Sequence, residues 1–326
     1  MSASTMTSDK DIDPLDLPIC TTCGTQFSTP TPPSPCPICD DPRQYLPPSG
    51  QDYTTLRALR APTHEPPLKN ILAPLNNTNT NTKIYTLHTT PKHCIGQRAF
   101  LLLTPHGNIL WDCIPYLDDD TITQINALGG ISAIIISHPH YYATHLVWAE
   151  VFNCPVYLSV EDREWVMRLS PQDSSVQGGG GSGGKQIFWE GKEVEVLPGS
   201  GVIGVKTGGH FPGSSVLWWK DEGVMFLADT IGTIPSGVGD YGSRGRREGT
   251  ASYTFMWSYP NMIPLPPDEV HGIWKAIKHT EFDRAYGAFM GMDTVGNCKK
   301  RVLDSAKIFV RAMGYLDHAI HEEDCA

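Results

Sequence analysis

Hydrophobic residues in the middle of the chain recur in short runs that Gly and charged residues separate. IYTLHTT (84–90), RAFLLLT (98–104) and ILWDCI (109–114) predict strands, with the turn signal PHGN before the third. GISAIIIS (130–137) predicts a buried strand, because it is short, rich in β-branched residues and preceded by glycine. A second set of short apolar runs, between residues 186 and 230, predicts further strands.

Helical periodicity appears between these strands and after them. Residues 121–128, 143–152 and 160–169 predict helices that alternate with strands. DEVHGIWKAIKHT (268–280) is amphipathic, and residues 298–316 predict a final helix with one apolar face. Helices interposed between strands, then more strands, then closing helices indicate an α/β sandwich with helices outside two sheets.

The segments before and after this region differ in composition. Residues 1–19 are polar and acidic, and we expect a disordered leader. Residues 20–50 contain two CxxC pairs and predict a small metal-binding segment. Residues 51–82 are rich in Pro, Asn and Thr, so we expect an extended arm with little regular structure. The main domain is then expected over 83–315, with a tail over 316–326.

Composition and charge narrow the class of protein. The chain has 326 residues, 40% hydrophobic and 18% charged, which is typical of a globular enzyme. Its formal charge of −10 argues against a nucleic-acid partner. No apolar run approaches the roughly 18 residues that a membrane helix requires, and the N-terminus lacks a signal-peptide core. We therefore expect a cytoplasmic protein that acts on a small-molecule substrate.

The two CxxC pairs predict a metal site. Twelve residues separate the pairs, and four thiolates suit a tetrahedral Zn²⁺ ion with a structural role. The pairs resemble a zinc ribbon and also a rubredoxin, since Gly24 and Pro37 match the rubredoxin form. Asp40 stands where rubredoxins have a second glycine, which favours zinc over iron. The predicted ligands are Cys20, Cys23, Cys36 and Cys39.

A second set of candidate ligands lies in the main domain. His138 and His140 follow a predicted strand, and on an extended segment side chains two residues apart point the same way. His210 follows another strand and a Gly-Gly pair. Asp229 ends the apolar run VMFLAD, where a carboxylate is costly to bury without a cation or hydrogen bonds. These four residues predict a metal site at the ends of buried strands.

The order of these motifs resembles the metallo-β-lactamase family over residues 83–313. The resemblance is carried by His138-x-His140, Gly209-His210 and Asp229 in LADT, with Asp112 as a buried structural acid. It implies an αββα sandwich and a metal-dependent activity.

The sequence departs from the family's HxHxDH pattern. Tyr142 stands at the Asp position and Ala143 at the last His position. The predicted last strand, AYGAFMG (285–291), also lacks the late histidine of the family. The resemblance therefore implies that one of two metal positions is retained.

The candidate ligands are compatible with three functions. Three imidazoles and a carboxylate can hold one Zn²⁺ ion and leave a place for water, which predicts a hydrolase of esters, thioesters or amides. Asp229 is expected to act as a ligand or as a base toward that water, and Tyr142 or Tyr141 to donate a hydrogen bond to an oxyanion. The same ligands also suit Fe(II) in an oxidoreductase similar to persulfide dioxygenases. The third possibility is an inactive binding protein. His145 is expected to lie outside the ligand set.

Overall fold

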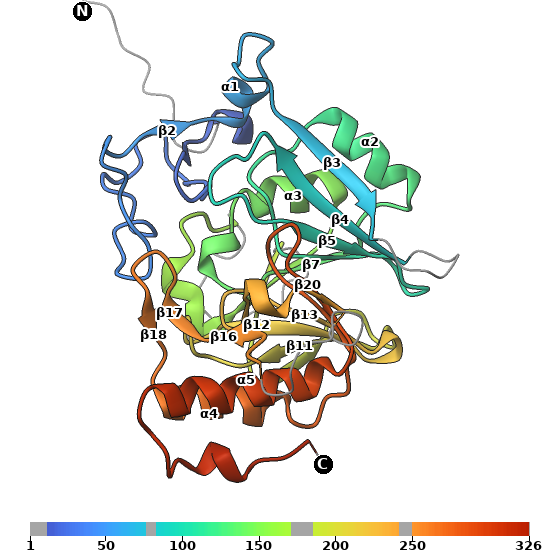
Figure 1. Ribbon diagram of the computed structural model, residues 1–326. Coiled ribbons are helices and arrows are strands. Elements are labelled where there is room, and N and C mark those ends of the chain that lie inside the picture. Colours follow the sequence, from blue (N-terminus) through green and yellow to red (C-terminus); the bar gives the residue numbers. More distant parts are fainter. Residues whose placement is uncertain (1–11, 76–82, 171–184, 241–249, 326) are drawn as a thin grey trace, which may run out of the picture.

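The computed structural model describes residues 12–75, 83–170, 185–240 and 250–325. Within them, two seven-stranded sheets pack face to face. Helices α2 (Asp119–Ala127) and α3 (His145–Phe152) lie outside the first sheet, and α4 (Pro267–Ile277) and α5 (Cys298–Ala312) lie outside the second (Figure 1). The predicted αββα sandwich is therefore confirmed.

The first sheet runs in the order β3-β4-β5-β6-β7-β8-β9. Its first four strands pair antiparallel, and β6 to β9 pair parallel. Parallel neighbours bring their carboxyl ends to one edge, where loops can carry a site. The bounds are β3 (Lys69–Pro74), β4 (Ile84–Thr90), β5 (Ala99–Leu102), β6 (Ile109–Trp111), β7 (Ala133–Ile135), β8 (Val156–Ser159) and β9 (Gln186–Trp189).

The second sheet runs in the order β10-β11-β12-β13-β19-β20-β15. Strands β10 to β13 pair antiparallel, and β13 pairs parallel with β19. The bounds are β10 (Glu193–Glu195), β11 (Val202–Lys206), β12 (Ser215–Trp219), β13 (Val224–Phe226), β15 (Gly239–Asp240), β19 (Arg284–Tyr286) and β20 (Asp293–Val295). Smaller elements are β1 (Ile19–Cys20), β2 (Tyr53–Thr54), α1 (Leu56–Arg60), β14 (Gly232–Thr233), β16 (Tyr253–Thr254), β17 (Met256–Ser258) and β18 (Ile263–Pro264).

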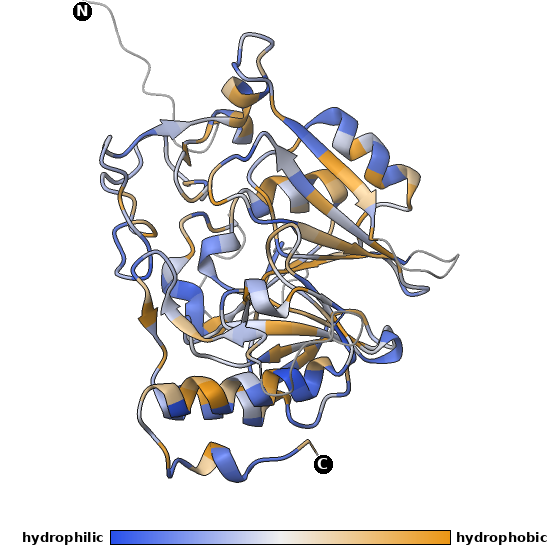
Figure 2. Ribbon diagram, viewed as in Figure 1, coloured by the Kyte–Doolittle hydropathy of each residue, from blue (hydrophilic) through white to orange (hydrophobic). Residues whose placement is uncertain are grey.

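Hydrophobic burial holds the layers together. Between the sheets, the ring of Phe226 lies 5.0 Å from that of Phe100 and 5.8 Å from that of Tyr286. Outside the second sheet, α4 buries Val270, Ile273, Trp274 and Ile277, which recur at the three- and four-residue spacing of one helix face. Figure 2 shows this alternation of apolar and polar residues along α4. The periodic pattern in the sequence thus marks the buried face.

The predicted leader is wrong for residues 12–19, whereas residues 1–11 lie outside the described residues. Leu17 is buried, and Ile19 pairs with Thr54 in a short antiparallel ladder. Arg57 on α1 pairs with the carboxylates of Asp13 and Asp16, each at 2.6 Å. Contacts with residues 35 to 44 positions downstream, which local composition does not reveal, hold this segment in place.

The predicted arm is also wrong over Lys69–Pro74. This segment is β3, the edge strand of the first sheet, and it pairs with β4 along six residue pairs. A six-residue run with Asn and Pro shows little alternation, so pairing with β4 decides its conformation. Residues 76–82 of the predicted arm lie outside the described residues.

Two further expectations need correction. The predicted helix over 160–169 is only a 3₁₀ helix, Val160–Trp165, within which Asp162 accepts a hydrogen bond from the Gly213 N–H at 2.7 Å. The predicted C-terminal tail is docked, because Ile320 is fully buried and the Glu323 carboxylate lies 2.9 Å from His271 Nε2. Both segments are shaped by contacts with distant elements.

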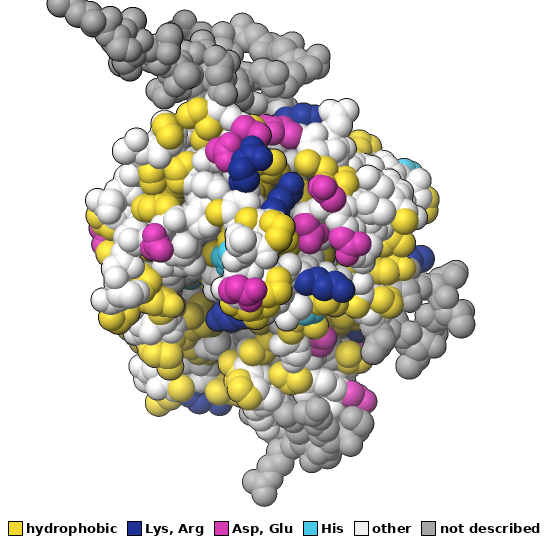
Figure 3. All heavy atoms as spheres, turned by 90° about the horizontal axis from the view of Figure 1, so that it is seen from above, with side chains coloured by type: hydrophobic (Ala, Val, Ile, Leu, Met, Phe, Trp, Pro, Cys, Tyr) yellow, Lys and Arg dark blue, Asp and Glu magenta, His cyan; other side chains and the backbone are white. Residues whose placement is uncertain are grey.

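Helix length and surface charge complete the description of the fold. Among the described helices, none has the length and apolar composition to cross a bilayer. On the face shown in Figure 3, Lys and Arg side chains lie interspersed with Asp and Glu side chains.

Candidate functional site

Three loops at one edge of the sandwich carry the four candidate ligands of the main domain. His138 follows β7 and stands directly before the 3₁₀ turn Pro139–Tyr141. His210 follows β11 after Gly208 and Gly209, whose φ angles of +66° and +88° suit glycine. A side chain at Gly209 would also meet Ile273, Leu265 and Thr230 at 3.0 Å. Asp229 follows β13, so both sheets contribute to the site.

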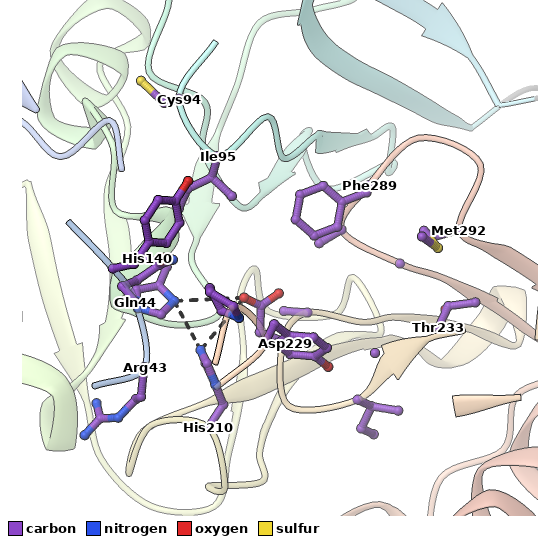
Figure 4. A pocket seen from close by; sticks show the side chains of 18 of the residues that line it. Arg43, Gln44, Cys94, Ile95, His140, His210, Asp229, Thr233, Phe289 and Met292 are labelled. Atoms are coloured by element: carbon purple, nitrogen blue, oxygen red, sulfur yellow. Dashed lines mark hydrogen bonds and ion pairs between the residues drawn. The ribbon is translucent and has the colours of Figure 1, made fainter. Parts of the chain in front are cut away.

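The four side chains converge on one point. His138 Nε2, His140 Nδ1 and His210 Nε2 lie 3.4, 3.9 and 3.8 Å from Asp229 Oδ2. His210 Nε2 lies 3.1 Å from His140 Nδ1. One ligand atom from each residue falls within 4.8 Å of every other. Figure 4 shows His140, His210 and Asp229 pointing toward one another.

These distances fit a single metal ion. Ligands at about 2.1 Å from a tetrahedral ion lie about 3.4 Å apart, close to the observed separations. His138 Nε2 is buried, faces Asp229 and makes no hydrogen bond among the described residues. A buried ring nitrogen without a partner is costly unless it binds something. The cluster is therefore a metal-binding group.

Hydrogen bonds to the outer ring nitrogens orient two of the histidines. Ser137 Oγ lies 2.9 Å from His138 Nδ1, and the Met256 carbonyl lies 3.2 Å from His210 Nδ1. In each ring the nitrogen on the other side faces the cluster. Such outer partners set the tautomer of a metal-binding histidine.

The electrostatics of the site favour neutral imidazoles at His140 and His210 beside an ionised Asp229 carboxylate. Burial lowers the pKa of His140 to about 4. Burial, together with the neighbouring imidazoles, holds the pKa of His210 well below its ordinary value. Burial alone would raise the pKa of Asp229, but the neighbouring imidazoles of His138, His140 and His210 hold it well below the ordinary value. Ring lone pairs and a carboxylate are thus available to a cation at neutral pH.

The tyrosine that reaches the cluster is Tyr141. Its hydroxyl donates a hydrogen bond to Asp229 Oδ1 at 2.5 Å, which leaves Oδ2 facing the histidines. The expected catalytic residue, Tyr142, is buried, packs against His145 and does not line the cavity described below. The 3₁₀ turn after His138 explains the difference, because residues three apart then share a face. The Tyr141 and His138 rings accordingly lie 4.4 Å apart.

Two other residues named from the sequence lie outside the ligand set. Asp112 accepts the Ser137 N–H at 2.8 Å, and burial raises the pKa of its carboxyl to about 8. His145 is buried, with Nδ1 2.8 Å from the Tyr142 carbonyl and Nε2 2.7 Å from Gln186 Nε2. Both support the loop that carries His138 and His140.

The four cysteines form a second metal-binding group. Cys20 Sγ lies 3.6 Å from Cys39 Sγ, and Cys23 Sγ lies 3.8 Å from Cys36 Sγ. Thiolates at about 2.3 Å from a tetrahedral ion lie about 3.8 Å apart, whereas a disulfide would need about 2.05 Å. Gln51 Nε2 donates a hydrogen bond to Cys20 Sγ at 3.2 Å. The four sulfur atoms fit a single metal ion whose ligand shell they would close.

A cavity of about 330 Å³ lies beside the His/Asp cluster, with His140, His210 and Asp229 in its wall. The cysteine-bearing segment, residues 20–50, supplies another part of that wall. Figure 4 shows Gln44 beside His140, and Phe289 and Met292 farther along the cavity. The other lining residues are Thr22, Arg43, Tyr45, Lys92, Cys94, Ile95, Ala228, Ile231, Gly232, Thr233, Tyr259, Pro260, Gly287 and Ala288.

Specific contacts fasten the cysteine segment to the site. The Arg43 guanidinium lies 4.0 Å from the centroid of the Phe211 ring, which lies 4.9 Å from the His140 ring. Asn261, between β17 and β18, donates hydrogen bonds to the carbonyls of Pro42 and Gln44 at 2.9 and 3.0 Å. Asn261 belongs to the aromatic segment 257–261, for which the sequence alone left open a cover for the site or ordinary packing.

Comparisons with known proteins find a matching family and a relative. The sequence model described as "Metallo-beta-lactamase superfamily" matches residues 95–276, more than half of the chain. The Bacillus subtilis (strain 168) protein "Uncharacterized protein YmaE" is 38% identical over 300 residues, covering 90% of this chain and 96% of that protein.

Two solved structures of low sequence identity also match the chain. The crystal structure of VMB-1 matches 76% of this chain and 98% of its own, with 11% identity and a TM-score of 0.49. The peroxy diiron species of the chemotaxis sensor ODP matches 74% and 94%, with 12% identity and a TM-score of 0.46.

Proposed function

Since the chain belongs to the metallo-β-lactamase superfamily, we propose that it is a metal-dependent hydrolase with one metal ion at its reaction centre. The substrate is a small molecule with an ester, thioester or amide bond. The ion at the His/Asp cluster is zinc, and a second zinc ion in the four-thiolate group has a structural role.

The proposal rests on the ligand cluster that opens onto the cavity. His140, His210 and Asp229 belong both to the cluster and to the wall of the cavity. A substrate in the cavity therefore meets the cluster directly. At two of the positions where the family has its remaining ligands, this chain has Tyr142, which packs against His145, and Ala143.

The residues present suit hydrolysis. A zinc ion held by the three imidazoles would lower the pKa of a bound water toward neutrality. In the reaction, the oxygen of a water molecule forms a bond to the carbonyl carbon, the bond to the leaving group breaks, and the leaving group takes a proton from that water. The ionised Asp229, whose Oδ1 is held by Tyr141, would complete the ligand set through Oδ2, and the water would bind as a further ligand of the ion. The closed four-thiolate group has no open position for such chemistry.

Metal content and ester hydrolysis test the proposal together. The purified chain should hold about two zinc ions, one for each group of ligands. His140→Ala should lower this to about one ion and abolish hydrolysis of activated aryl esters. His106→Ala, at an exposed histidine outside the cluster, is the matched control and should change neither quantity.

Two outcomes would replace the proposal. Iron in place of zinc at the cluster, with oxygen uptake in the presence of small thiol compounds, would favour the oxidoreductase. A metal content that His140→Ala leaves unchanged, with no hydrolysis by the wild type, would favour a binding protein.

A further inference from the structure

Lys92, between β4 and β5, is a cation at the mouth of the cavity. It lines the cavity, is exposed, and forms no ion pair with any residue in the described ranges. Its position is restrained by Gly96. A Cβ atom at Gly96 would lie only 2.6, 2.7 and 2.9 Å from Cγ, Cε and Cδ of Lys92, so the lysine stem occupies the space that a side chain would fill. The backbone of Gly96 (φ +80°) therefore forms a cradle for this stem.

The other charges of the cavity wall are already engaged. Asp229 faces the three histidines, and it is the acidic residue in the lining. The Arg43 guanidinium lies over the rings of Phe211, Trp165 and Trp257. Its Nε and Nη1 are buried, and Nε lies 3.6 Å from Asp41 Oδ1. Lys92 is thus the lining cation that a ligand can approach without displacing a protein partner.

The rest of the wall is largely apolar. Ile95, Ile231, Phe289 and Met292 line the cavity together with the ring of Tyr45. Figure 4 places Phe289 and Met292 on the side of the cluster that faces away from Arg43. Apolar walls with a few placed polar groups are typical of small-molecule sites, in which the polar groups set the orientation.

We propose that the substrate is a small carboxylic-acid derivative with an apolar body and a separate anionic group, and that Lys92 binds this group. The apolar body then lies along Ile95 and Phe289, with the scissile carbonyl at the His/Asp cluster. This inference rests on the proposed hydrolase function and adds the substrate class. The net charge of −10 repels anions in general, so an unpaired cation at the mouth provides local selectivity.

A pair of matched esters tests whether the site prefers a substrate that carries an anionic group. 4-Nitrophenyl hydrogen glutarate and 4-nitrophenyl valerate have acyl chains of similar length, but only the first carries a carboxylate. Wild type should hydrolyse the anionic ester with a kcat/KM about fivefold higher than that for the neutral ester, because the KM of the anionic ester should be lower. Lys92→Gln should remove this preference, and Lys92→Arg should restore most of it. Lys220→Gln, at an exposed lysine outside the cavity lining, makes the same charge change and should leave the preference intact.

A binding measurement separates this inference from the proposed function. Titration calorimetry with phenylacetate should show binding that weakens about fivefold in Lys92→Gln and, in wild type, between about 20 and 200 mM salt. If wild type hydrolyses no ester but binds phenylacetate through Lys92, only the proposed function fails. If wild type hydrolyses both esters equally well, or if Lys92→Gln binds phenylacetate as wild type does, the role of Lys92 is refuted. Failure of wild type to bind phenylacetate also refutes it.

Discussion

Tyr141→Phe tests how this site holds its metal. The substitution removes one oxygen atom and keeps the ring that packs 4.4 Å from His138. The lost interaction is the 2.5 Å hydrogen bond to Asp229 Oδ1, between a buried tyrosine and a partly buried carboxylate. A hydrogen bond to a charged group contributes about 1.5–3 kcal/mol, and outer partners of metal ligands typically affect affinity by about 10- to 100-fold. We therefore expect the affinity of the His/Asp cluster for zinc to fall by about 10- to 100-fold.

The assay is competition between the protein and a chelator of known zinc affinity. The four-thiolate group serves as an internal reference, because Tyr141 belongs to the other cluster, and its affinity should not change. Tyr253→Phe is the matched control: Tyr253 is also a buried tyrosine, but its hydroxyl lies 2.6 Å from Thr294 Oγ1, away from the ligands. The reasoning is refuted if Tyr141→Phe binds zinc at the His/Asp cluster within twofold of wild type.

Two further predictions concern the cavity wall and the support of the metal loop. Tyr45→Ala should raise KM several-fold without changing the zinc content, because Tyr45 lines the cavity but is no ligand; an unchanged KM would show that this wall does not meet the substrate. Burial lowers the pKa of His145 from 6.5 to about 4, so the unfolded chain binds a proton below pH 6.5 that the folded chain binds only near pH 4. Stability should therefore fall on acidification, with about 2 kcal/mol lost between pH 7 and pH 5 through this residue. Urea unfolding at both pH values should show a smaller loss of unfolding free energy for His145→Gln than for wild type. An equal loss in both proteins would contradict the attribution of this loss to His145.

Local features of the sequence determined the classes of element and the candidate ligands. Cys20 and Cys23, like Cys36 and Cys39, lie close in the chain, so their spacing alone predicts a shared ion. The periodicity of 268–280 marks the buried face of α4, because each residue's place on a helix follows from its number. The four residues His138, His140, His210 and Asp229 were named from their chemistry at the ends of strands.

The tertiary structure alone decided how these parts meet. Tyr141, and not Tyr142, reaches Asp229, because the segment after His138 is a 3₁₀ turn and not an extended strand. The part of the cavity wall that contains Gln44 depends on a hydrogen bond from Asn261, which lies 217 positions away in the chain. The edge strand β3 likewise exists because β4 offers it a partner. Such contacts depend on strand order and on the packing of whole layers, which local propensity and spacing do not encode.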